Sequence, residues 1–488
     1  MIRMNYFLLN FASENCVFFS KNVFFVMTEE KKERALFTTR LGAVAAAVGS
    51  AVGLGNIWRF PYETGQNGGA AFLLIYICAV IVLGIPLLVA EFTIGRSAHA
   101  NVARAFKKLA PGTPWYWVGV MGMLVAIIIL GFYLIILGWT FSYTFRAVAN
   151  DFMSVVSAAQ TADPTVDAAT VLSNDFADFS SSAWQPLMWL VIAVVANAVI
   201  MMAGVQKGIE RASNVMMPLL CVLLLLLVVN SFFLPGFADG CDFLFNPDFS
   251  KVTAKTFIVA MGQAFFSLSL AMGIMLAYGS YLGDNTKIGK TATQVVCLDT
   301  LIAILAGVVI FPACFSYGIE PGAGPGLVFI TLPNVFLQMP GGYFCCIAFF
   351  LLISLAGLTS CMSLFEVPIS FFQEELKMSR KAATALSVVI VLMLGTASSL
   401  SLGIWDAKFF GDSFFDFCDK ITSLYMMPVG AFFISLFVGW KLDKDIIRDA
   451  LTNWRNDSGW YIRPLLWLLR IFTPICIMLI FLSGIGIF

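Results

Sequence analysis

The chain has 488 residues, of which 60% are hydrophobic and 12% charged, and its mean hydropathy is +0.89. This composition excludes an ordinary soluble globular protein, and the balance of 29 basic and 29 acidic residues does not favour nucleic acid as a partner. With one histidine, His99, the chain cannot form a histidine-based catalytic or metal cluster, and we expect no enzyme. The 11 cysteines are scattered, mostly in apolar runs, and indicate small core residues rather than disulfides.

The N-terminal segment differs from the rest. Residues 1–26 contain apolar patches too short to cross a membrane, and Met27 is followed by a charged stretch. We expect an overextended start within a cytoplasmic segment 1–40, with a cleaved signal as the alternative.

Long apolar windows then recur to the end of the chain. A hydrocarbon core about 30 Å thick needs roughly 20 apolar residues per helical crossing. Windows between charged or Pro/Gly-rich breaks predict an all-α membrane protein with eleven spans: 42–65, 70–95, 115–145, 184–203, 213–234, 254–282, 292–317, 342–373, 382–402, 413–440 and 464–487. The odd number places the two termini on opposite sides of the membrane.

Lys and Arg orient these spans. They gather in alternate loops, for example Arg104, Lys107 and Lys108, on the side of the N-terminal segment, whereas the intervening loops are acidic or neutral. The positive-inside rule predicts a cytoplasmic N-terminus and a periplasmic C-terminus, in a bacterial inner membrane. The segments 146–183 and 318–340 are then external.

The first and sixth spans contain features that disfavour a regular helix. Residues 49–56, GSAVGLGN, put three glycines and an asparagine at mid-membrane depth, and Ser267 and Ser269 would point to nearly opposite sides of a regular helix. Interrupted helices at corresponding positions of two repeats are typical of a transport site. The alternatives are helix packing through Gly49 and Gly53, and serine hydroxyls bonded to the preceding turn.

These segments resemble the neurotransmitter:sodium symporter family, in particular its bacterial amino-acid transporters. The matching segments are 50–61, 67–69, Gly84-Ile85-Pro86 with Glu91, 263–269 and 356–360. The resemblance implies two inverted five-helix repeats with discontinuous first and sixth helices, plus an eleventh helix. We expect the first repeat at 41–234, the second at 235–440, and a cytoplasmic loop with the last span at 441–488. The eleven expected spans depart from the family's usual twelve, as in some of its bacterial members.

The resemblance also implies two sodium ions as co-substrates. The first site would use Ala51, Asn56, Ser267 and Asp299. Asp299 either ligates sodium where relatives carry asparagine, or lies one turn away where chloride-independent relatives carry an acid. Both placements put a negative charge beside sodium, so no chloride requirement is expected. The second site would use Gly49, Val52, Ala356, Thr359 and Ser360.

An amino-acid substrate would lie between the broken helices. The resemblance places its carboxylate at the Leu54 and Gly55 amides and the Tyr133 hydroxyl, and its ammonium group at carbonyls and the Ser269 hydroxyl. Since Ala51 stands where amine transporters carry an acid, a zwitterion is favoured over a monoamine. The expected substrate contacts are Ala51, Leu54, Gly55, Ile129, Tyr133, Phe266, Ser267, Ser269, Met272 and Leu364. The apolar part of this pocket predicts a hydrophobic L-amino acid, branched aliphatic or aromatic.

Two gates complete the expected site. By resemblance, Arg59 pairs with Asp419 outside, with Asp416 as a competing partner, and Arg34 pairs with Glu374 inside. The segment from Gly208 to Pro218 resembles an element whose unwinding admits cytoplasmic water.

The sequence thus predicts a sodium-coupled symporter in contact with membrane lipid. A proton-coupled carrier of the same architecture would commonly replace Thr359-Ser360 or Asn56, which are intact. An amino-acid sensor would keep the pocket but normally carries a soluble output domain.

Overall fold

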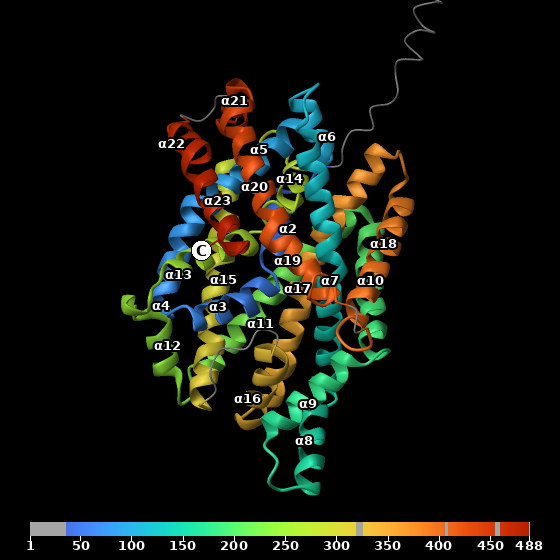
Figure 1. Cartoon of the computed structure of the whole chain (residues 1–488), viewed down its shortest axis with the longest axis vertical. Helices are drawn as coiled ribbons and strands as arrows, with labels where there is room; N and C mark the ends of the chain where they lie inside the picture. The colour runs from blue at the N-terminus through green and yellow to red at the C-terminus, as the bar shows by residue number, and fades with distance from the viewer. Residues whose placement is uncertain (1–35, 319–325, 406–407, 454–458, 488) are drawn as a thin grey trace, which may run out of the picture. The chain divides into compact units, whose positions relative to one another are not determined.

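A computed structural model describes residues 36–318, 326–405, 408–453 and 459–487, and these residues are almost entirely helical (Figure 1). The expected start segment and Arg34 lie outside the described residues. The longer helices are α2 (Arg40–Ala51), α3 (Phe60–Gln66), α4 (Ala70–Ala79), α5 (Ile85–Ala98), α6 (Val102–Leu109), α7 (Tyr116–Val148), α8 (Asp151–Ala162), α9 (Ala168–Ser181), α10 (Gln185–Met202), α11 (Arg211–Ser231), α12 (Phe237–Phe245), α13 (Ala254–Ser267), α14 (Ile274–Gly279), α15 (Ile288–Ser316), α16 (Leu332–Gln338), α17 (Gly342–Glu375), α18 (Arg380–Leu400), α19 (Phe414–Lys420), α20 (Met427–Leu436), α21 (Lys444–Leu451), α22 (Ile462–Trp467) and α23 (Thr473–Gly484).

Several spans contain short wider turns, which join neighbouring helices. Those relevant here are η1 (Gly55–Arg59), η3 (Val205–Glu210), η5 (Leu327–Thr331), η6 (Ile421–Met426), η7 (Phe437–Lys441) and η8 (Leu468–Phe472).

Ten of the eleven predicted spans have the length and apolarity of a membrane crossing. Within the described residues, nine are long apolar helices, and a tenth is the pair α2 and Gly55–Gln66, bent by 50°. The remaining window, 254–282, contains α13 and α14, with 14 and 6 residues, which are each shorter than a crossing. The predicted fold class is confirmed, with its two broken helices at positions one and six.

Both breaks have local causes. α2 ends at Ala51 because the next residue, Val52, is extended, with φ −71° and ψ 99°. Between α13 and α14 the chain turns through three positive φ angles, 51° at Ser269, 61° at Ala271 and 77° at Gly273. Only glycine adopts such angles without strain, so the two other residues must be held by their surroundings.

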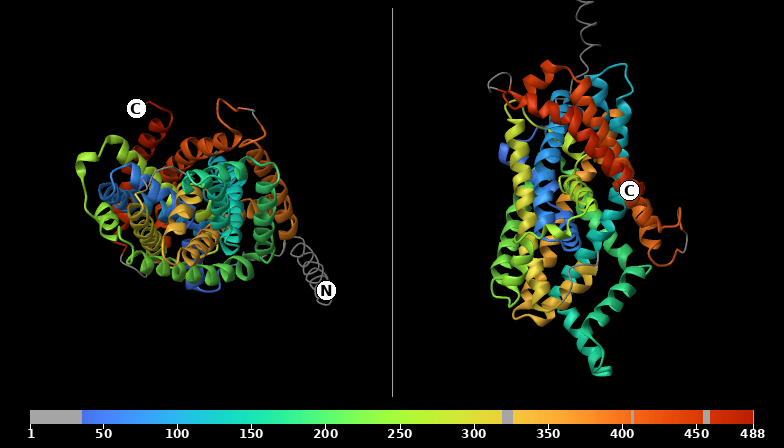
Figure 2. Two further views of the ribbon diagram at one scale, coloured as in Figure 1. Left: turned by 90° about the horizontal axis from the view of Figure 1, so that it is seen from below. Right: turned by 60° about the vertical axis from the view of Figure 1, so that its left-hand side comes forward.

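The broken helices lie among long continuous ones. α7 and α17, with 33 and 34 residues, pack along each other, and α2 packs on α17 and α11. α14 packs on α5, whereas α13 packs on α4 and α23. Two views show the hairpin α8–α9 at the opposite end from α6 and α21 (Figures 1 and 2), so the loops that the charge pattern assigns to different sides lie apart.

The second half of the first broken helix contacts an aromatic cluster around Phe329 of η5. The ring centroid of Phe329 lies 6.4 Å from that of Trp58, 5.7 Å from Trp139 and 5.4 Å from Phe176. Phe329 therefore connects the first span with α7 and the hairpin helix α9.

Close packing of α5 on α14 gives a test of the fold. A methyl group at Gly95 would lie 2.1 Å from the Leu276 carbonyl oxygen, whereas one at Gly262 on α13 would meet no atom within 4 Å. We expect Gly95→Ala to lower the thermal unfolding temperature in detergent, because the backbone of α14 at Leu276 cannot easily move away from the added methyl group. The matched control Gly262→Ala should leave it unchanged or raise it, since alanine favours a helix by about 1 kcal/mol. Equal unfolding temperatures would contradict this packing.

Candidate functional site

A small cavity lies between the two helix breaks, α7 and α17. Its volume accessible to the centres of water molecules is about 30 Å³. It is lined by Ser50, Ala51, Gly53, Gly55, Ile129, Tyr133, Phe266, Ser269, Met272, Ile274, Ser360 and Leu364. Eight of the ten expected substrate contacts are in this lining, and the other two, Leu54 and Ser267, adjoin it in sequence. The sequence analysis did not expect Ser50, Gly53 and Ile274 in this lining.

The polar end of the cavity is formed by the first break. The Leu54 amide donates to the Tyr133 hydroxyl at 3.1 Å, and the Ser269 hydroxyl donates to the Ser50 carbonyl at 3.0 Å. A Cβ atom at Gly53 would lie 2.5 Å from the Ser360 hydroxyl oxygen, so a side chain there would close the space. Amides, hydroxyls and carbonyls thus converge at the first break, and most of the remaining lining residues are apolar.

Glu91 of α5 holds the second break in place. This carboxylate is fully buried, and its Oε1 atom accepts a 2.6 Å hydrogen bond from the Ala271 amide. The other oxygen, Oε2, has no partner in the described part of the chain. The bond explains how Ala271 is held at a positive φ. A carboxylate in an apolar run was the signal for this role, which the sequence analysis did not assign.

A buried oxygen cluster adjoins the cavity. The Ser267 hydroxyl donates to Asp299 Oδ2 at 2.7 Å, and the Asn56 amide nitrogen donates to Asp299 Oδ1 at 2.8 Å. The Tyr76 hydroxyl, which the sequence analysis missed, donates to Ser267 at 3.2 Å. All four side chains are at most 1% exposed. A carboxylate and hydroxyls are hard ligands that suit sodium, so Ser267 and Asp299 fit this ion. The Asn56 amide oxygen instead accepts from the Gly53 amide at 3.1 Å.

The expected second-site residues lie where α2 meets α17. The Thr359 hydroxyl donates to the Ala356 carbonyl at 2.9 Å, and the Ser360 hydroxyl donates to the Ser50 carbonyl at 3.3 Å. A Cβ atom at Gly49 would lie 3.4 Å from Thr359 Cβ, so the helices are in direct contact. Hydroxyl and carbonyl oxygens without net charge also suit sodium.

The expected outer ion pair of Arg59 and Asp419 is not formed. Arg59 Nε lies 3.5 Å from Glu63, one turn further along the same span, and no acid of α19 pairs with it in the described part of the chain. The guanidinium carbon lies 4.7 Å from the centroid of the Phe266 ring. A second cavity of about 330 Å³, lined by Arg59, Phe266 and Ser423 among others, extends from here toward η6, α20 and α23. Phe266 lines both cavities, and Arg59 lies over its ring at the side of the larger one.

At the inner end, Glu374 accepts bonds from the Asn101 backbone and side-chain nitrogens at 2.9 and 3.1 Å. Its expected partner Arg34 lies outside the described residues. Glu374 therefore participates in the N-terminal cap of α6.

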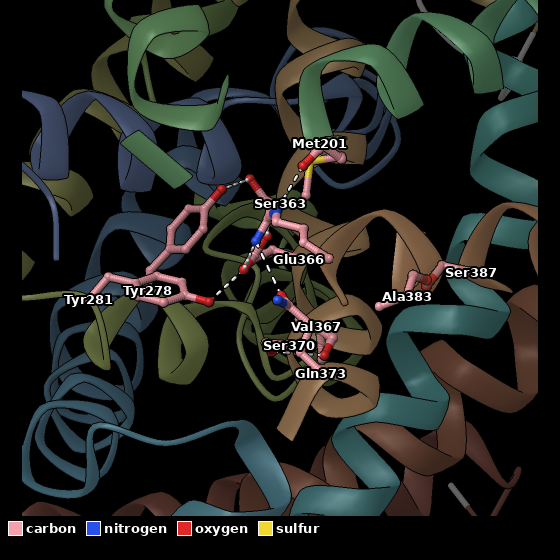
Figure 3. A network of polar contacts seen from close by, with 11 residues as sticks. Met201, Tyr278, Tyr281, Ser363, Glu366, Val367, Ser370, Gln373, Ala383 and Ser387 are labelled. Atoms are coloured by element: carbon pink, nitrogen blue, oxygen red, sulfur yellow. Dashed lines mark hydrogen bonds and ion pairs between the residues drawn. The ribbon is translucent and has the colours of Figure 1, made fainter. Parts of the chain in front are cut away.

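An ion pair joins the buried Glu366 of α17, about two turns beyond Ser360, to the largely buried Arg380 at the start of α18 (Figure 3). Glu366 is 0% exposed and accepts from Arg380 at 2.6 Å and from the Tyr281 hydroxyl at 2.5 Å. Arg380 also donates to the Met201 carbonyl at 2.8 Å. The Phe37 ring packs edge-on against Tyr281, with centroids 5.9 Å apart. Four spans and the residues before α2 thus meet at Glu366, which the sequence analysis missed although it is a carboxylate in an apolar run.

The expected unwinding element contacts the start of α2. Glu210, at the end of η3, accepts hydrogen bonds from the Thr38 and Thr39 amides at 2.8 and 3.1 Å. A Cβ atom at Gly42 would lie 2.2 Å from this carboxylate, so glycine permits the approach. Movement of η3 would therefore release the first turn of α2.

Comparison with known proteins agrees with this geometry. The model of the "Sodium:neurotransmitter symporter family" matches residues 34–154 and 165–488. The chain is 37% identical to an uncharacterized sodium-dependent transporter of Bacillus subtilis, covering 94% of this chain and 99% of that protein. It is 35% identical to one of Haemophilus influenzae, covering 94% and 100%. A crystal structure of MhsT in complex with L-phenylalanine is similar with a TM-score of 0.83 and 41% identity, covering 92% of this chain and 100% of MhsT.

The contribution of the Glu366–Arg380 pair to stability can be tested by substitution. Glu366→Gln should destabilise the protein strongly, by about 3–5 kcal/mol, because Arg380 keeps its charge without a carboxylate partner. The control Glu375→Gln removes a carboxylate whose partner Arg104 is 46% exposed, and should cost about 0–1 kcal/mol. Thermal unfolding in detergent measures both, and the double variant Glu366→Gln with Arg380→Gln should recover part of the loss. A Glu366→Gln protein as stable as Glu375→Gln would contradict the structural role of this pair.

Proposed function

Because this chain belongs to the sodium:neurotransmitter symporter family, we propose that it is a sodium-coupled symporter that imports a hydrophobic L-amino acid by alternating access. Members of this family are transporters and not enzymes. The observation that carries the proposal is the cavity between the two helix breaks, which has a polar end, an apolar wall and the Asp299 oxygen cluster beside it.

The two ends of the cavity suit the two ends of an amino acid. We propose that the Leu54 and Gly55 amides and the Tyr133 hydroxyl bind the carboxylate, because the exposed amides of an interrupted helix favour an anion. Carbonyls of Ala51 and Phe266 and the Ser269 hydroxyl would bind the ammonium group. Support comes from the 3.1 Å contact between Leu54 and Tyr133, which a substrate carboxylate would replace.

Two sodium ions are proposed as co-substrates. The first would be held by Ala51, Asn56, Ser267 and Asp299, and the second by Gly49, Val52, Ala356, Thr359 and Ser360. The proximity of Asp299 to Asn56 and Ser267 supports a direct ligand role over a place one turn away. Because Asp299 supplies a fixed negative charge, we propose that chloride is not required.

The apolar wall favours a hydrophobic side chain. Ile129, Met272 and Leu364 offer no partner for a charged group, and burying an unpaired charge costs several kcal/mol. Ala271 favours the smaller substrates, because its positive φ and its bond to Glu91 restrict the turn that carries Met272. L-Phenylalanine was bound by MhsT, so aromatic substrates stay within the proposed class.

Transport would proceed by movement of the proposed repeats, 41–234 and 235–440, around this site. We propose that Arg59 and Phe266 close the outer path, with Asp419 as the partner that Arg59 acquires on closure. Inside, Arg34 with Glu374, and the network around Glu366, would close the path. Glu210 would couple the unwinding of η3 to the start of α2.

The proposed location is the bacterial inner membrane, with a cytoplasmic N-terminus and a periplasmic C-terminus. The basic residues around α6 and the acidic hairpin α8–α9 at the opposite end support this orientation. A proton-coupled carrier is the nearest alternative and an amino-acid sensor is the other. Uptake that does not depend on sodium would favour the proton-coupled carrier. Sodium-dependent binding without uptake would favour the sensor.

Uptake into proteoliposomes tests the function. We expect labelled leucine to accumulate only with an inward sodium gradient and to be displaced by isoleucine, valine and methionine, because one methylene group is worth about 1–3 kcal/mol in an apolar pocket. Lysine, arginine and glutamate should not compete. Leu364→Ala should shift preference toward phenylalanine, tyrosine and tryptophan, and Thr359→Val with Ser360→Ala should abolish sodium-driven uptake. Displacement by glutamate or lysine above every apolar amino acid would refute the pocket, and sodium dependence in the double variant would refute the second site.

The buried carboxylate of Asp299 leads to a prediction of how uptake depends on chloride. Replacing chloride with gluconate should leave uptake by the unaltered protein unchanged, because the carboxylate already balances the sodium charge. Asp299→Asn should lose activity or become stimulated by chloride. An unaltered protein that stops without chloride would show that Asp299 does not have this role.

A further inference from the structure

Arg470 lies inside the last span and has no acidic partner among the described residues. It is the ninth residue of Ile462–Gly484, about 12 Å along the helix from its start at 1.5 Å per residue. Neighbouring Gly439 and Trp440 belong to η7, which ends the tenth span at Lys441. Arg470 is therefore level with the boundary where the tenth span leaves the membrane.

The guanidinium is held in a fixed position. Arg470 Nε donates to the Gly439 carbonyl, the Trp440 indole nitrogen donates to the Arg470 carbonyl at 3.2 Å, and the guanidinium carbon lies 5.7 Å from the centroid of the Trp440 rings. A Cβ atom at Gly439 would lie 3.0 Å from Arg470 Cγ, so glycine allows this close approach. The Ser435 hydroxyl, which donates to the Leu469 carbonyl at 2.6 Å, fixes the same crossing.

Most of the N–H donors of Arg470 have no partner among the described residues. A guanidinium has five N–H donors, and Nε uses one of them. The two terminal nitrogens have no hydrogen-bond or ion-pair partner in the described part of the chain. A planar guanidinium matches the geometry of phosphate oxygens, so these preorganised donors point to an anionic ligand from outside the chain.

The surroundings decide which anion fits. Trp440 is 67% exposed, and Trp467, which is one helical turn before Arg470, is 55% exposed. Tryptophan is enriched at the level of lipid headgroups. Lys441 is exposed beside Trp440 and adds positive charge. From the guanidinium, the exposed indoles and this charge, we propose that Arg470 and Trp440 form a binding site for the headgroup phosphate of an anionic phospholipid. The terminal nitrogens bind the phosphate oxygens, the indoles cover its glycerol region, and the lipid stabilises the contact between the tenth and eleventh spans.

Native mass spectrometry of the full chain in detergent tests this site. The probes are phosphatidylglycerol, phosphatidylcholine with the same acyl chains, and glycerol phosphate as the free anion. We expect phosphatidylglycerol to bind at least about fivefold more tightly than phosphatidylcholine, and Arg470→Gln to weaken it by about fivefold, from roughly 1 kcal/mol per basic residue at an anionic membrane surface. The control Arg463→Gln removes an exposed charge two turns away on the same helix, and should change binding less than about twofold.

Three results would overturn the proposal. They are equal binding of the two lipids, phosphatidylglycerol binding that Arg470→Gln does not change, and glycerol phosphate that binds as tightly as the lipid. If Arg470→Gln does not fold, Arg470→Lys keeps the charge but loses the planar fork. It should bind phosphatidylglycerol more weakly than Arg463→Lys, and equal binding would again refute the site.

Discussion

The structure depends on one constraint, which is that backbone amides and carbonyls freed by a helix break inside a membrane must find other partners. The chain supplies these partners as buried side chains from neighbouring helices. Asn56 accepts from the Gly53 amide at 3.1 Å, Tyr133 from Leu54 at 3.1 Å and Glu91 from Ala271 at 2.6 Å. The same groups line or adjoin the cavity, so the contacts that stabilise the breaks also create the site.

The buried carboxylates show how charge is used in this apolar protein. Asp299 lies among hydroxyl and amide donors and is suited to a cation, whereas Glu366 is neutralised by Arg380 within the chain. Glu91 binds a backbone amide and keeps one oxygen without a partner in the described residues. All three acids stand in apolar runs of the sequence, but each has a different environment in the structure. The side chains and backbone groups of the neighbouring helices determine that environment.

The two ends of the site are built differently. At the proposed outer end, Arg59 lies over the ring of Phe266, which lines both the small and the larger cavity. At the proposed inner end, Tyr281 and Phe37 lie beside the pair of Glu366 and Arg380, and Glu210 accepts from the Thr38 amide just before α2. The inner contacts use buried charges and several helices, so they require a larger rearrangement than a change of the Arg59 side chain.

The sequence by itself determined the helices, the class of protein and the position of the two breaks. Apolar windows of membrane length and glycines at mid-membrane depth are local signals, because the bilayer imposes the same length and hydrogen-bonding demands on every span. The ordered motifs also indicated which residues would meet at the cavity. Tertiary structure decided the pairing of charges. Arg59 pairs with Glu63 of its own span and not with Asp419. Glu366 pairs with Arg380 fourteen residues away, and Arg470 contacts the ring of Trp440 on the preceding span. Such pairings depend on distances between helices, and these follow from packing of side chains that no single stretch of sequence specifies.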